Sequence, residues 1–479
     1  MKKYANQEDR KLKVVIGGAG PAGLTASYLL SKMGVASQVF EADKNVGGIA
    51  KTVEHNGFLF DLGGHRFFTK IKPVEDLWIQ VMGESMPTRK RVSSIYYNKK
   101  IFDYPLNPKN VLTNMGLLES SKIFLSYLGA RLLTSREKGC FEDYVSSRFG
   151  RRLYETFFKN YTEKIWGMPC SEINHMWASQ RIKDMTFTSV AKSALTGSDA
   201  NIRSLIQEFM YPDYGAGQMW DRMADEVESH GGSIKTQSRI SSVNINADKV
   251  ESVGVENQEG KSVVSVNHFI SSLPLRDLIL MINPTPPSDV LDAARKLKYR
   301  EFIVVALILD EKNSRPENWI YVHDEKVKVG RIQFYNNWSP YLSPSEDKTC
   351  IGVEYFCNEG DGLWNTCDSR LVDMAYKEFD SLELFKQHPK LVDSRVVRVK
   401  KAYPVYDLGY RENLETVKKY IESIKNLSTI GRAGLHKYNN MDHSMLTAIY
   451  AVENIYGAYK DVWSINERGE YHEKKPEPA

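Results

Sequence analysis

The sequence has few cysteines and no long apolar run. Its five cysteines include no C-x-x-C pair and no Cys/His spacing typical of a metal site, so we expect reduced thiols and no bound metal. The longest apolar run, 302–309, is far shorter than the ~20 residues that cross a bilayer. The opening stretch 1–13 holds no hydrophobic segment, so we expect no signal peptide. Together these absences predict a cytoplasmic protein without a membrane span.

The sequence also lacks an excess of charge of one sign and the usual hydrolase motifs. The formal net charge is +4 over 479 residues, which is too small a surplus to favour nucleic-acid binding. No Ser/His/Asp, Cys/His or H-E-x-x-H arrangement is present, so neither a hydrolase nor a metalloenzyme is indicated. The 42% hydrophobic and 26% charged residues are typical of a globular protein, long enough for about three domains.

The feature that does indicate a function is a glycine-rich turn near the N-terminus. An apolar strand precedes Gly18, Gly20 and Gly23, which have G-x-G-x-x-G spacing and open a helical pattern. The first glycine permits the tight turn, the second lets the backbone approach a pyrophosphate, and the third lets helix and strand pack closely. Ala22 lies at the helix N-terminus, which attracts the anion, and Glu41 ends the next strand, where a carboxylate binds ribose hydroxyls. The sequence therefore predicts a dinucleotide site, and Glu41 disfavours a 2′-phosphate.

Two further glycine pairs follow this motif. Gly47 and Gly48 come shortly after the acidic residue, and Gly63 and Gly64 precede a histidine. By themselves these residues leave NAD and FAD open as cofactors. Their order, however, resembles the FAD proteins of the amine oxidase, protoporphyrinogen oxidase and UDP-galactopyranose mutase superfamily. Ile49 departs from that pattern, because the superfamily commonly has an arginine after the second glycine pair.

The superfamily resemblance implies FAD as the cofactor and adds segments from the rest of the chain. It implies that the backbone at Val243 contacts the adenine and that a C-terminal strand and helix reach the flavin ribityl chain. The residues expected to bind FAD are Gly18, Gly20, Ala22, Gly23, Glu41, Gly47, Gly48, Gly64, Val243, Gly431, Asp442 and Ser444.

Several stretches resemble the UDP-galactopyranose mutases in particular. Three of them are the glycine–histidine–aromatic run 63–68, the Y-T-E-K-I-W-G run 161–167 and the C-terminal run 437–444. A fourth, the W-I-Y run 319–321 with a following arginine, is similar to the eukaryotic mutases. Thr162 fits the bacterial pattern rather than the eukaryotic one, so the expected substrate pocket is mixed.

The mutase resemblance implies a specific reaction. Reduced FAD would interconvert the pyranose and furanose forms of a nucleotide-diphosphate sugar, with flavin N5 as the nucleophile and no net redox change. The main task left to the protein is to stabilise the departing diphosphate, and arginine suits it because its planar guanidinium stays charged and binds phosphate oxygens in pairs. An external reductant would keep the flavin reduced. The sequence leaves the sugar, the nucleotide and the oligomeric state open.

The same resemblance implies roles for residues at matching positions. Arg331 is the expected arginine for the leaving group, and His65 is expected beside the flavin. The mutases need a second arginine, for which Arg181 and Arg91 are open candidates. The other residues expected to contact the substrate are Trp319, Tyr321, Tyr403 and Tyr438.

Some of these residues also have a simpler structural interpretation. His65 could be a satisfied core histidine, Arg331 a solvated charge at a strand edge, and Trp166 a buried anchor. Glu163 and Lys164 could pair across the helical region or face water. The alternative function is an FAD-dependent oxidoreductase of the amine oxidase or protoporphyrinogen oxidase type, which would need an apolar tunnel rather than arginines. No feature supports a non-enzymatic flavin protein.

The order of patterns along the chain predicts an α/β protein, α+β overall, with a discontinuous FAD-binding domain. The glycine motif stands near the start of the sequence, and a strand and a helix close it. We therefore expect residues 11–70, 201–280 and 426–460 to fold together as a Rossmann-like FAD-binding domain.

The remaining segments are expected to form two further domains. Residues 71–200 have a helical pattern and are expected to form a mostly helical insertion domain. Residues 285–425 are expected to form an antiparallel β-sheet substrate domain, and 466–479 a flexible tail. The active site is expected where the three domains meet.

Overall fold

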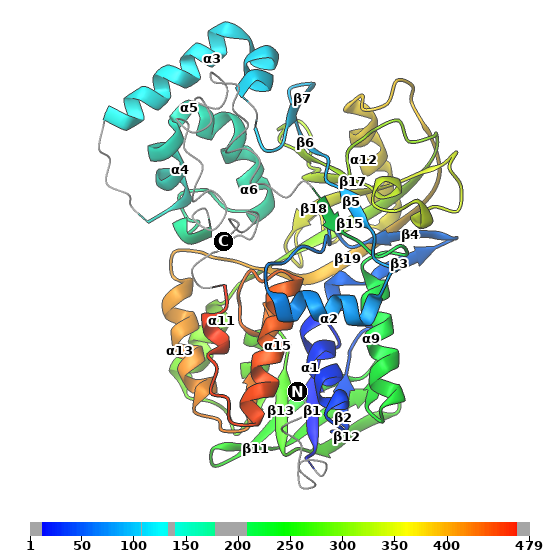
Figure 1. The fold of residues 1–479 in the computed structure, drawn as a ribbon. Helices are drawn as coiled ribbons and strands as arrows, with labels where there is room; N and C mark the ends of the chain where they lie inside the picture. The colour runs from blue at the N-terminus through cyan, green and yellow to red at the C-terminus, as the bar shows by residue number, and fades with distance from the viewer. Residues whose placement is uncertain (1–11, 107, 133–138, 178–207, 467–479) are drawn as a thin grey trace.

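The structure is a computed structural model that describes residues 12–106, 108–132, 139–177 and 208–466. Figure 1 shows three groups of elements: the two chain-terminal segments in the lower half, a helical region at the upper left, and a curved sheet at the upper right. This arrangement brings segments that are far apart in the sequence to a common centre.

A five-stranded parallel sheet runs through the lower group. Its strand order is β20-β13-β1-β2-β9, and every neighbouring pair is parallel. Because β1 is central, the glycine-rich turn that follows it opens at the carboxyl edge of the sheet, where such folds bind nucleotides. The strands are β1 (Val14–Gly17), β2 (Ser37–Phe40), β9 (Ser233–Lys235), β13 (His268–Ser271) and β20 (Leu427–Thr429).

The two faces of the parallel sheet contribute to different hydrophobic cores. Val14 and Ile16 pack against one set of helices and Val15 packs on the opposite side, because successive side chains of a strand point to opposite faces. The helices on the first side are α1 (Pro21–Lys32), α2 (Lys72–Met82), α9 (Gly217–Ser229) and α15 (Met441–Ile455). Those on the second side are α10 (Leu275–Leu280), α11 (Ser288–Lys296) and α13 (Tyr410–Glu422).

A four-stranded sheet completes the second core. Its order is β12-β11-β10-β14, with antiparallel pairs except for β10 and β14. The strands are β10 (Arg239–Asn246), β11 (Lys249–Asn257), β12 (Gly260–Ser265) and β14 (Ile282–Asn283).

A seven-stranded sheet forms the upper right group, in the order β19-β15-β18-β17-β16-β6-β7. Only β16 and β6 pair in parallel. The helix α12 (Asp368–Ser381) covers one face, and β15 is buried on both faces, which explains the long apolar run of its sequence. The strands are β6 (Ser93–Tyr97), β7 (Lys100–Asp103), β15 (Tyr299–Asp310), β16 (Trp319–Val322), β17 (Arg331–Phe334), β18 (Thr349–Cys357) and β19 (Lys390–Pro404).

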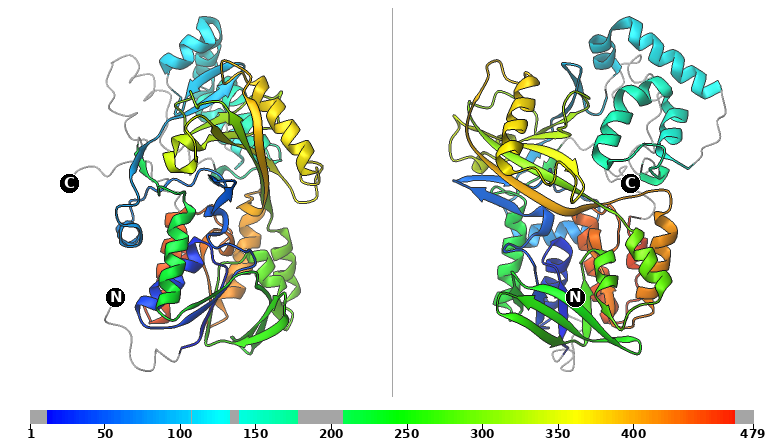
Figure 2. Two further views of the ribbon diagram at one scale, coloured as in Figure 1. Left: turned by 90° about the vertical axis from the view of Figure 1, so that its right-hand side faces the viewer. Right: turned by 180° about the vertical axis from the view of Figure 1, so that it is seen from behind.

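The helical region extends away from the two larger sheets, as the view from behind in Figure 2 also shows. It contains α3 (Pro108–Leu132), α4 (Phe141–Phe149), α5 (Arg151–Leu153), a π-helical turn (Tyr154–Lys159) and α6 (Asn160–Trp166). Two short ribbons, β3 (Thr52–His55) with β4 (Phe58–Asp61) and β5 (Thr88–Lys90) with β8 (Glu208–Met210), connect the groups. Within the described ranges, no helix combines the length and apolarity that crossing a membrane requires.

The predicted α/β class, with a parallel and an antiparallel sheet, is confirmed. Strand pairing and core packing cross the domain boundaries that the sequence predicts. The strands β6 and β7, expected in the helical insertion, extend the antiparallel sheet through β16, and α2 packs into the first core of the parallel sheet. The helices α11 and α13, expected with the antiparallel sheet, pack against the four-stranded sheet instead. The predicted tail lies almost wholly outside the described residues.

Candidate functional site

The glycine-rich turn after β1 has the shape that a pyrophosphate needs. Gly18 has a φ of +94°, and a Cβ on Gly23 would lie 1.9 Å from the Gly18 carbonyl oxygen, so both positions require glycine. Gly20 differs, because its φ is −78° and a Cβ there would meet only the Gly48 Cα, at 3.9 Å. Gly20 therefore borders open space at the N-terminus of α1, where free N–H groups attract an anion.

Two other glycine segments lie against this turn. The Gly47 N–H donates to the Ala19 carbonyl oxygen at 2.8 Å, and a Cβ on Gly48 would lie 3.2 Å from the Gly20 Cα. On the opposite side, a Cβ on Gly431 would lie 3.0 Å from the Ala22 Cβ. The second glycine pair and the C-terminal segment thus line the same space at the start of α1.

Glu41 stands beside the turn, as the motif requires. One of its carboxylate oxygens accepts the Ala19 N–H at 2.7 Å and the other accepts the Asp43 N–H at 2.9 Å. The chain that passes next to it is the turn between β9 and β10, where the Ser238 N–H donates to the Glu41 carbonyl oxygen at 2.8 Å. A carboxylate fixed in this way at the end of β2 suits the ribose of a dinucleotide.

Val243, whose backbone was expected to contact the adenine, already uses its N–H within the protein. Its N–H donates to the Met281 carbonyl oxygen at 2.8 Å, and its side chain is fully buried in the core beneath the four-stranded sheet. That N–H is therefore not available to an adenine ring. The backbone next to Glu41 is instead the stretch 235–238, which the strand pattern alone did not single out.

The C-terminal segment supplies a second helix N-terminus. The short helix α14 (Gly431–Gly434) leads into α15, whose first turn buries Asp442 and Ser444. Asp442 lines a cavity in front of this turn, whereas the Ser444 N–H is used inside the helix by the Asn440 carbonyl oxygen. This end of α15 suits the electron-rich edge of a flavin ring, since it presents N–H groups and a positive helix-dipole end.

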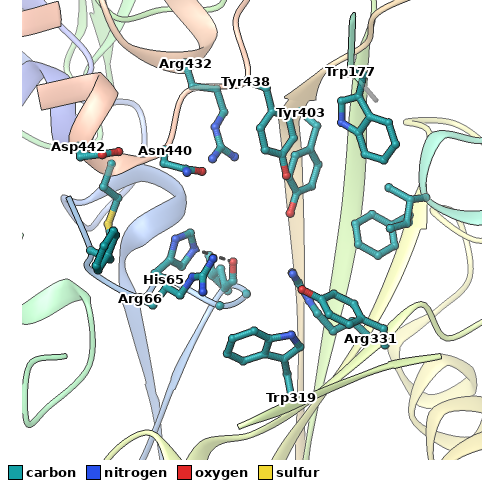
Figure 3. Close-up of a pocket in the computed structure, with 18 of the residues that line it drawn as sticks. His65, Arg66, Trp177, Trp319, Arg331, Tyr403, Arg432, Tyr438, Asn440 and Asp442 are labelled. Carbon is teal, nitrogen blue, oxygen red and sulfur yellow. Dashed lines mark hydrogen bonds between the residues drawn. The ribbon is translucent and has the colours of Figure 1, made fainter. Parts of the chain in front are cut away.

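The cavity lies between the start of α15, the helical region and the antiparallel sheet (Figure 3). Its walls come from the loop after β4, from α6, from β16 and β17, from β19 and from the start of α15. The predicted residues that it brings together are Gly64, His65, Trp319, Tyr321, Arg331, Tyr403, Tyr438 and Asp442. Arg181 lies outside the described residues, and Arg91 places its guanidinium over the Trp319 ring at 5.7 Å.

Two arginines of this cavity were not predicted from the sequence. Arg66 and Arg432 line it together with Arg331, and Figure 3 shows the three residues around one central space. Both lie inside motifs that the sequence shows, the glycine–histidine run and the C-terminal glycine segment, so the arginine in each motif was the signal that could have predicted them. Of the described residues that line the cavity, only Asp442 carries a carboxylate, so the cavity favours an anion.

Arg331 is held by a fully buried carboxylate behind it. Its Nε and Nη2 atoms donate to one oxygen of Glu354 at 2.8 and 2.5 Å, while Gln333 donates to the other oxygen at 2.9 Å. Burial opposes the charge of Arg331, but Glu354 together with Tyr403 and Tyr161 outweighs it and holds the pKa of the guanidinium well above its ordinary value. Arg331 is therefore a fixed cation and not a solvated edge charge.

Arg432 lies beside two stacked tyrosines. The rings of Tyr403 and Tyr438 are 5.5 Å apart and almost parallel, and the Arg432 guanidinium lies 4.9 Å from the centre of the second ring. The Arg432 Nε donates to the Asn439 carbonyl oxygen at 2.7 Å. Burial, with the neighbouring Tyr438 second, raises the pKa of Tyr403 to about 12, so its hydroxyl stays protonated and can donate at neutral pH.

His65 faces the cavity as a neutral ring. Its Nε2–H donates to the Leu62 carbonyl oxygen at 2.9 Å, which fixes the ring within the loop after β4. Burial lowers the pKa of His65 to about 4, and the charges of Arg432 and Arg331 act in the same direction. The ring therefore stays uncharged at neutral pH and acts as a fixed wall of the cavity.

A buried aspartate anchors the start of this loop. The Asp61 carboxylate accepts hydrogen bonds from the Thr52 and Tyr211 hydroxyls, at 2.6 and 2.7 Å, and from the Ala216 N–H at 3.2 Å. Burial raises the pKa of Asp61 to about 6 in spite of these bonds. The carboxylate therefore joins the loop of His65 to β3 and to the turn before α9.

The titration of Asp61 predicts a pH dependence of stability. The folded chain binds a proton at Asp61 more tightly than the unfolded chain does. The stability that this proton contributes is therefore present below about pH 4 and is lost as the pH rises through about 6. We expect Asp61→Asn to remove this dependence, so that its unfolding free energy relative to the wild type increases from pH 4 to pH 7. Urea titrations at both pH values measure it, and an unchanged difference would contradict the assignment.

Three comparisons bear on the identity of this site. A family model described as flavin containing amine oxidoreductase matches residues 21–348. A crystal structure of reduced UDP-galactopyranose mutase superposes with a TM-score of 0.85 and 21% identity, and covers 96% of this chain and 99% of its own.

Two curated relatives match shorter stretches. A probable UDP-galactopyranose mutase of Klebsiella pneumoniae is 26% identical over 166 residues, which is 33% of this chain and 42% of the relative. Protoporphyrinogen oxidase 2 of Arabidopsis thaliana is 32% identical over 115 residues, 23% of this chain and 22% of the relative. The chain thus matches less than half the length of either relative, and the family match implies a flavin cofactor.

Proposed function

The chain belongs to the family of flavin containing amine oxidoreductases, and from that premise we propose that it is an FAD-dependent sugar mutase. It interconverts the pyranose and furanose forms of a nucleotide-diphosphate sugar without net oxidation. The fold shared with a UDP-galactopyranose mutase structure supports this proposal, and so does the charge of the cavity.

FAD is the flavin that these residues fit. The open space at Gly20 and the N-terminus of α1 take the pyrophosphate, and Glu41 takes the ribose. The start of α15 holds the flavin ring next to the cavity. When bound and reduced, the flavin supplies a nucleophilic nitrogen for the anomeric carbon.

The observation that carries the proposal is the convergence of Arg66, Arg331 and Arg432 on one cavity in front of the start of α15. The diphosphate of a nucleotide sugar carries two negative charges and gains a third on the oxygen that leaves the anomeric carbon, and fixed guanidinium groups stabilise this developing charge. An oxidase of apolar amines or porphyrins would gain nothing from three half-buried cations, because removing each of them partly from water costs desolvation energy.

The remaining residues of the cavity then have simple roles. The Tyr403 hydroxyl, which stays protonated, donates a hydrogen bond to a diphosphate oxygen, and Tyr438 stacks beside it. The faces of Trp319 and Tyr321 pack against the sugar. The neutral His65 ring forms a fixed wall of the cavity beside the flavin and does not transfer a proton.

The test is anaerobic incubation of dithionite-reduced, FAD-loaded protein with UDP-galactose and a panel of other nucleotide sugars. We expect one of them to give a new chromatographic peak of unchanged mass that the oxidised protein does not produce. Absence of any isomer, together with flavin reduction by an amine or a porphyrinogen and uptake of oxygen, would instead establish the oxidoreductase alternative.

A further inference from the structure

A short loop connects two residues of the proposed substrate site. Tyr321 near the end of β16 pairs with Arg331 at the start of β17, and the loop 323–330 joins these strands. Tyr321 also pairs with Ile95 of β6, and Arg331 pairs with Glu354 of β18, so the sheet holds both residues on their outer sides. The loop joins them on their shared side, so what holds the loop limits how the two residues can shift in the cavity.

Lys164 on α6 holds the loop from the side of the helical region. Its ammonium donates to three backbone carbonyl oxygens, those of Val322 at 3.2 Å, Asp324 at 2.9 Å and Val329 at 3.0 Å. An ammonium has three N–H donors, so all of its hydrogen-bonding capacity is used on this loop. Lys164 thus neither pairs with Glu163 nor faces water.

Glu378 on α12 holds the same loop through its N–H groups. One carboxylate oxygen accepts the Lys328 N–H and the other accepts the Val329 N–H, both at 2.9 Å. The Tyr355 hydroxyl also donates to this carboxylate, at 3.2 Å. A cation at the carbonyl groups and an anion at the N–H groups therefore attach one loop to two separate helices.

We propose that Lys164 and Glu378 are positioning residues, which hold the loop 323–330 so that Tyr321 and Arg331 present a fixed surface to the anionic substrate. The part of this inference that concerns the substrate rests on the proposed function. The attachment of the loop itself rests on the hydrogen bonds alone.

The aromatic neighbour of Lys164 on α6 supports the same assignment. The Tyr161 ring stacks on the His323 ring, with centres 4.4 Å apart, and meets the Tyr321 ring edge-on at 5.6 Å. Tyr161 also lines the cavity. The Y-T-E-K-I-W-G run therefore joins the loop to the site through both Tyr161 and Lys164.

The charge state of Lys164 makes the attachment depend on pH. Burial lowers the pKa of Lys164 to about 8, although the charges of Glu378, Asp324 and Glu325 oppose this, and the nearby His323 is neutral, with a pKa of about 3. Loss of the proton leaves two donors for three carbonyl groups. The pKa of Lys164 in the folded chain lies below its ordinary value, so loss of this proton does not lower the free energy of unfolding. We therefore expect the affinity for the substrate to fall above pH 8, because the loop loses a donor, without a matching loss of stability.

The test compares Lys164→Met and Glu378→Gln with Lys122→Met, which removes an exposed lysine elsewhere in the helical region. In FAD-loaded protein we expect hydrogen exchange at the Lys328 and Val329 amides to rise about tenfold in the first two variants and to stay unchanged in the third. The affinity for UDP-galactose, measured by calorimetry, should fall by a similar factor.

The pH profile separates positioning from general stability. Wild-type affinity for UDP-galactose should fall between pH 7 and 9, and Lys164→Met should show low affinity at both values, which also controls for titration of the nucleotide. Unchanged exchange at Lys328 and Val329 in Lys164→Met, or a persisting alkaline fall in that variant, would overturn the inference. If the loop loosens as expected but the wild type binds no nucleotide sugar, the proposed function fails while the loop attachment stands.

Discussion

Gly20→Val is expected to fold but to lose its flavin, so that the purified variant is colourless where the wild type is yellow. The backbone at Gly20 has an ordinary φ, and a Cβ there meets only one atom within 4 Å, so the fold tolerates a side chain. The branched side chain fills the space in front of the α1 N-terminus that the pyrophosphate needs. Visible absorbance reports the cofactor, and far-ultraviolet circular dichroism reports the fold.

Two other glycines serve as matched controls. Gly362→Val should keep the flavin, because a Cβ at Gly362 meets nothing within 4 Å. Gly23→Ala should fail to fold, because its Cβ would lie 1.9 Å from the Gly18 carbonyl oxygen. A yellow Gly20→Val variant would show that the phosphate binds elsewhere, and a colourless wild type that takes up no added FAD would overturn the cofactor proposal.

Arg331→Lys is expected to reduce mutase turnover by roughly 100-fold or more while the flavin stays bound. Lysine keeps a positive charge next to the buried Glu354, so the fold is preserved, but it lacks the planar fork that holds Glu354 and presents N–H groups to the diphosphate. The measurement is the rate of isomer formation by reduced protein at saturating substrate, together with the flavin content.

Arg331→Ala would be a less informative variant, because it leaves the fully buried Glu354 without its cation. Breaking such a pair costs about 3–5 kcal/mol of stability, so lost activity would not separate catalysis from folding. The matched control for Arg331→Lys is Arg398→Lys, because Arg398 on β19 pairs with Asp368 at 2.6 Å outside the cavity. Its turnover should equal that of the wild type. Full activity in Arg331→Lys would make Arg331 a structural partner of Glu354 only.

The local features of the glycine-rich turn after β1 could be predicted from the sequence. Gly18 and Gly23 are required by their own backbone angle and by contacts within a few residues, and Glu41 follows at the end of the next strand. Such requirements act over short stretches of chain and therefore leave a readable spacing. The position of Val243 could not be predicted in this way, because pairing with β14 determines where its N–H points.

The composition of the cavity depended on contacts between distant segments. Arg66, Arg331 and Arg432 come from the loop after β4, the start of β17 and the short helix α14, and no spacing rule connects them. The charge that balances Arg331 is also remote in sequence, since Glu354 lies on the neighbouring strand β18. Only the register of β17 against β18 brings the two together, because opposite residues of paired strands share a face.

The sequence by itself determined the glycine-rich turn, the α/β class and the presence of the tyrosines, tryptophans and arginines. The tertiary structure decided which of these residues share a cavity, and it placed Lys164 and Glu378 within hydrogen-bonding distance of the same loop. The physical reason is the range of the interactions. Backbone geometry and helix capping are fixed within a few residues, whereas a charged cavity exists only once separate sheets and helices have packed around it.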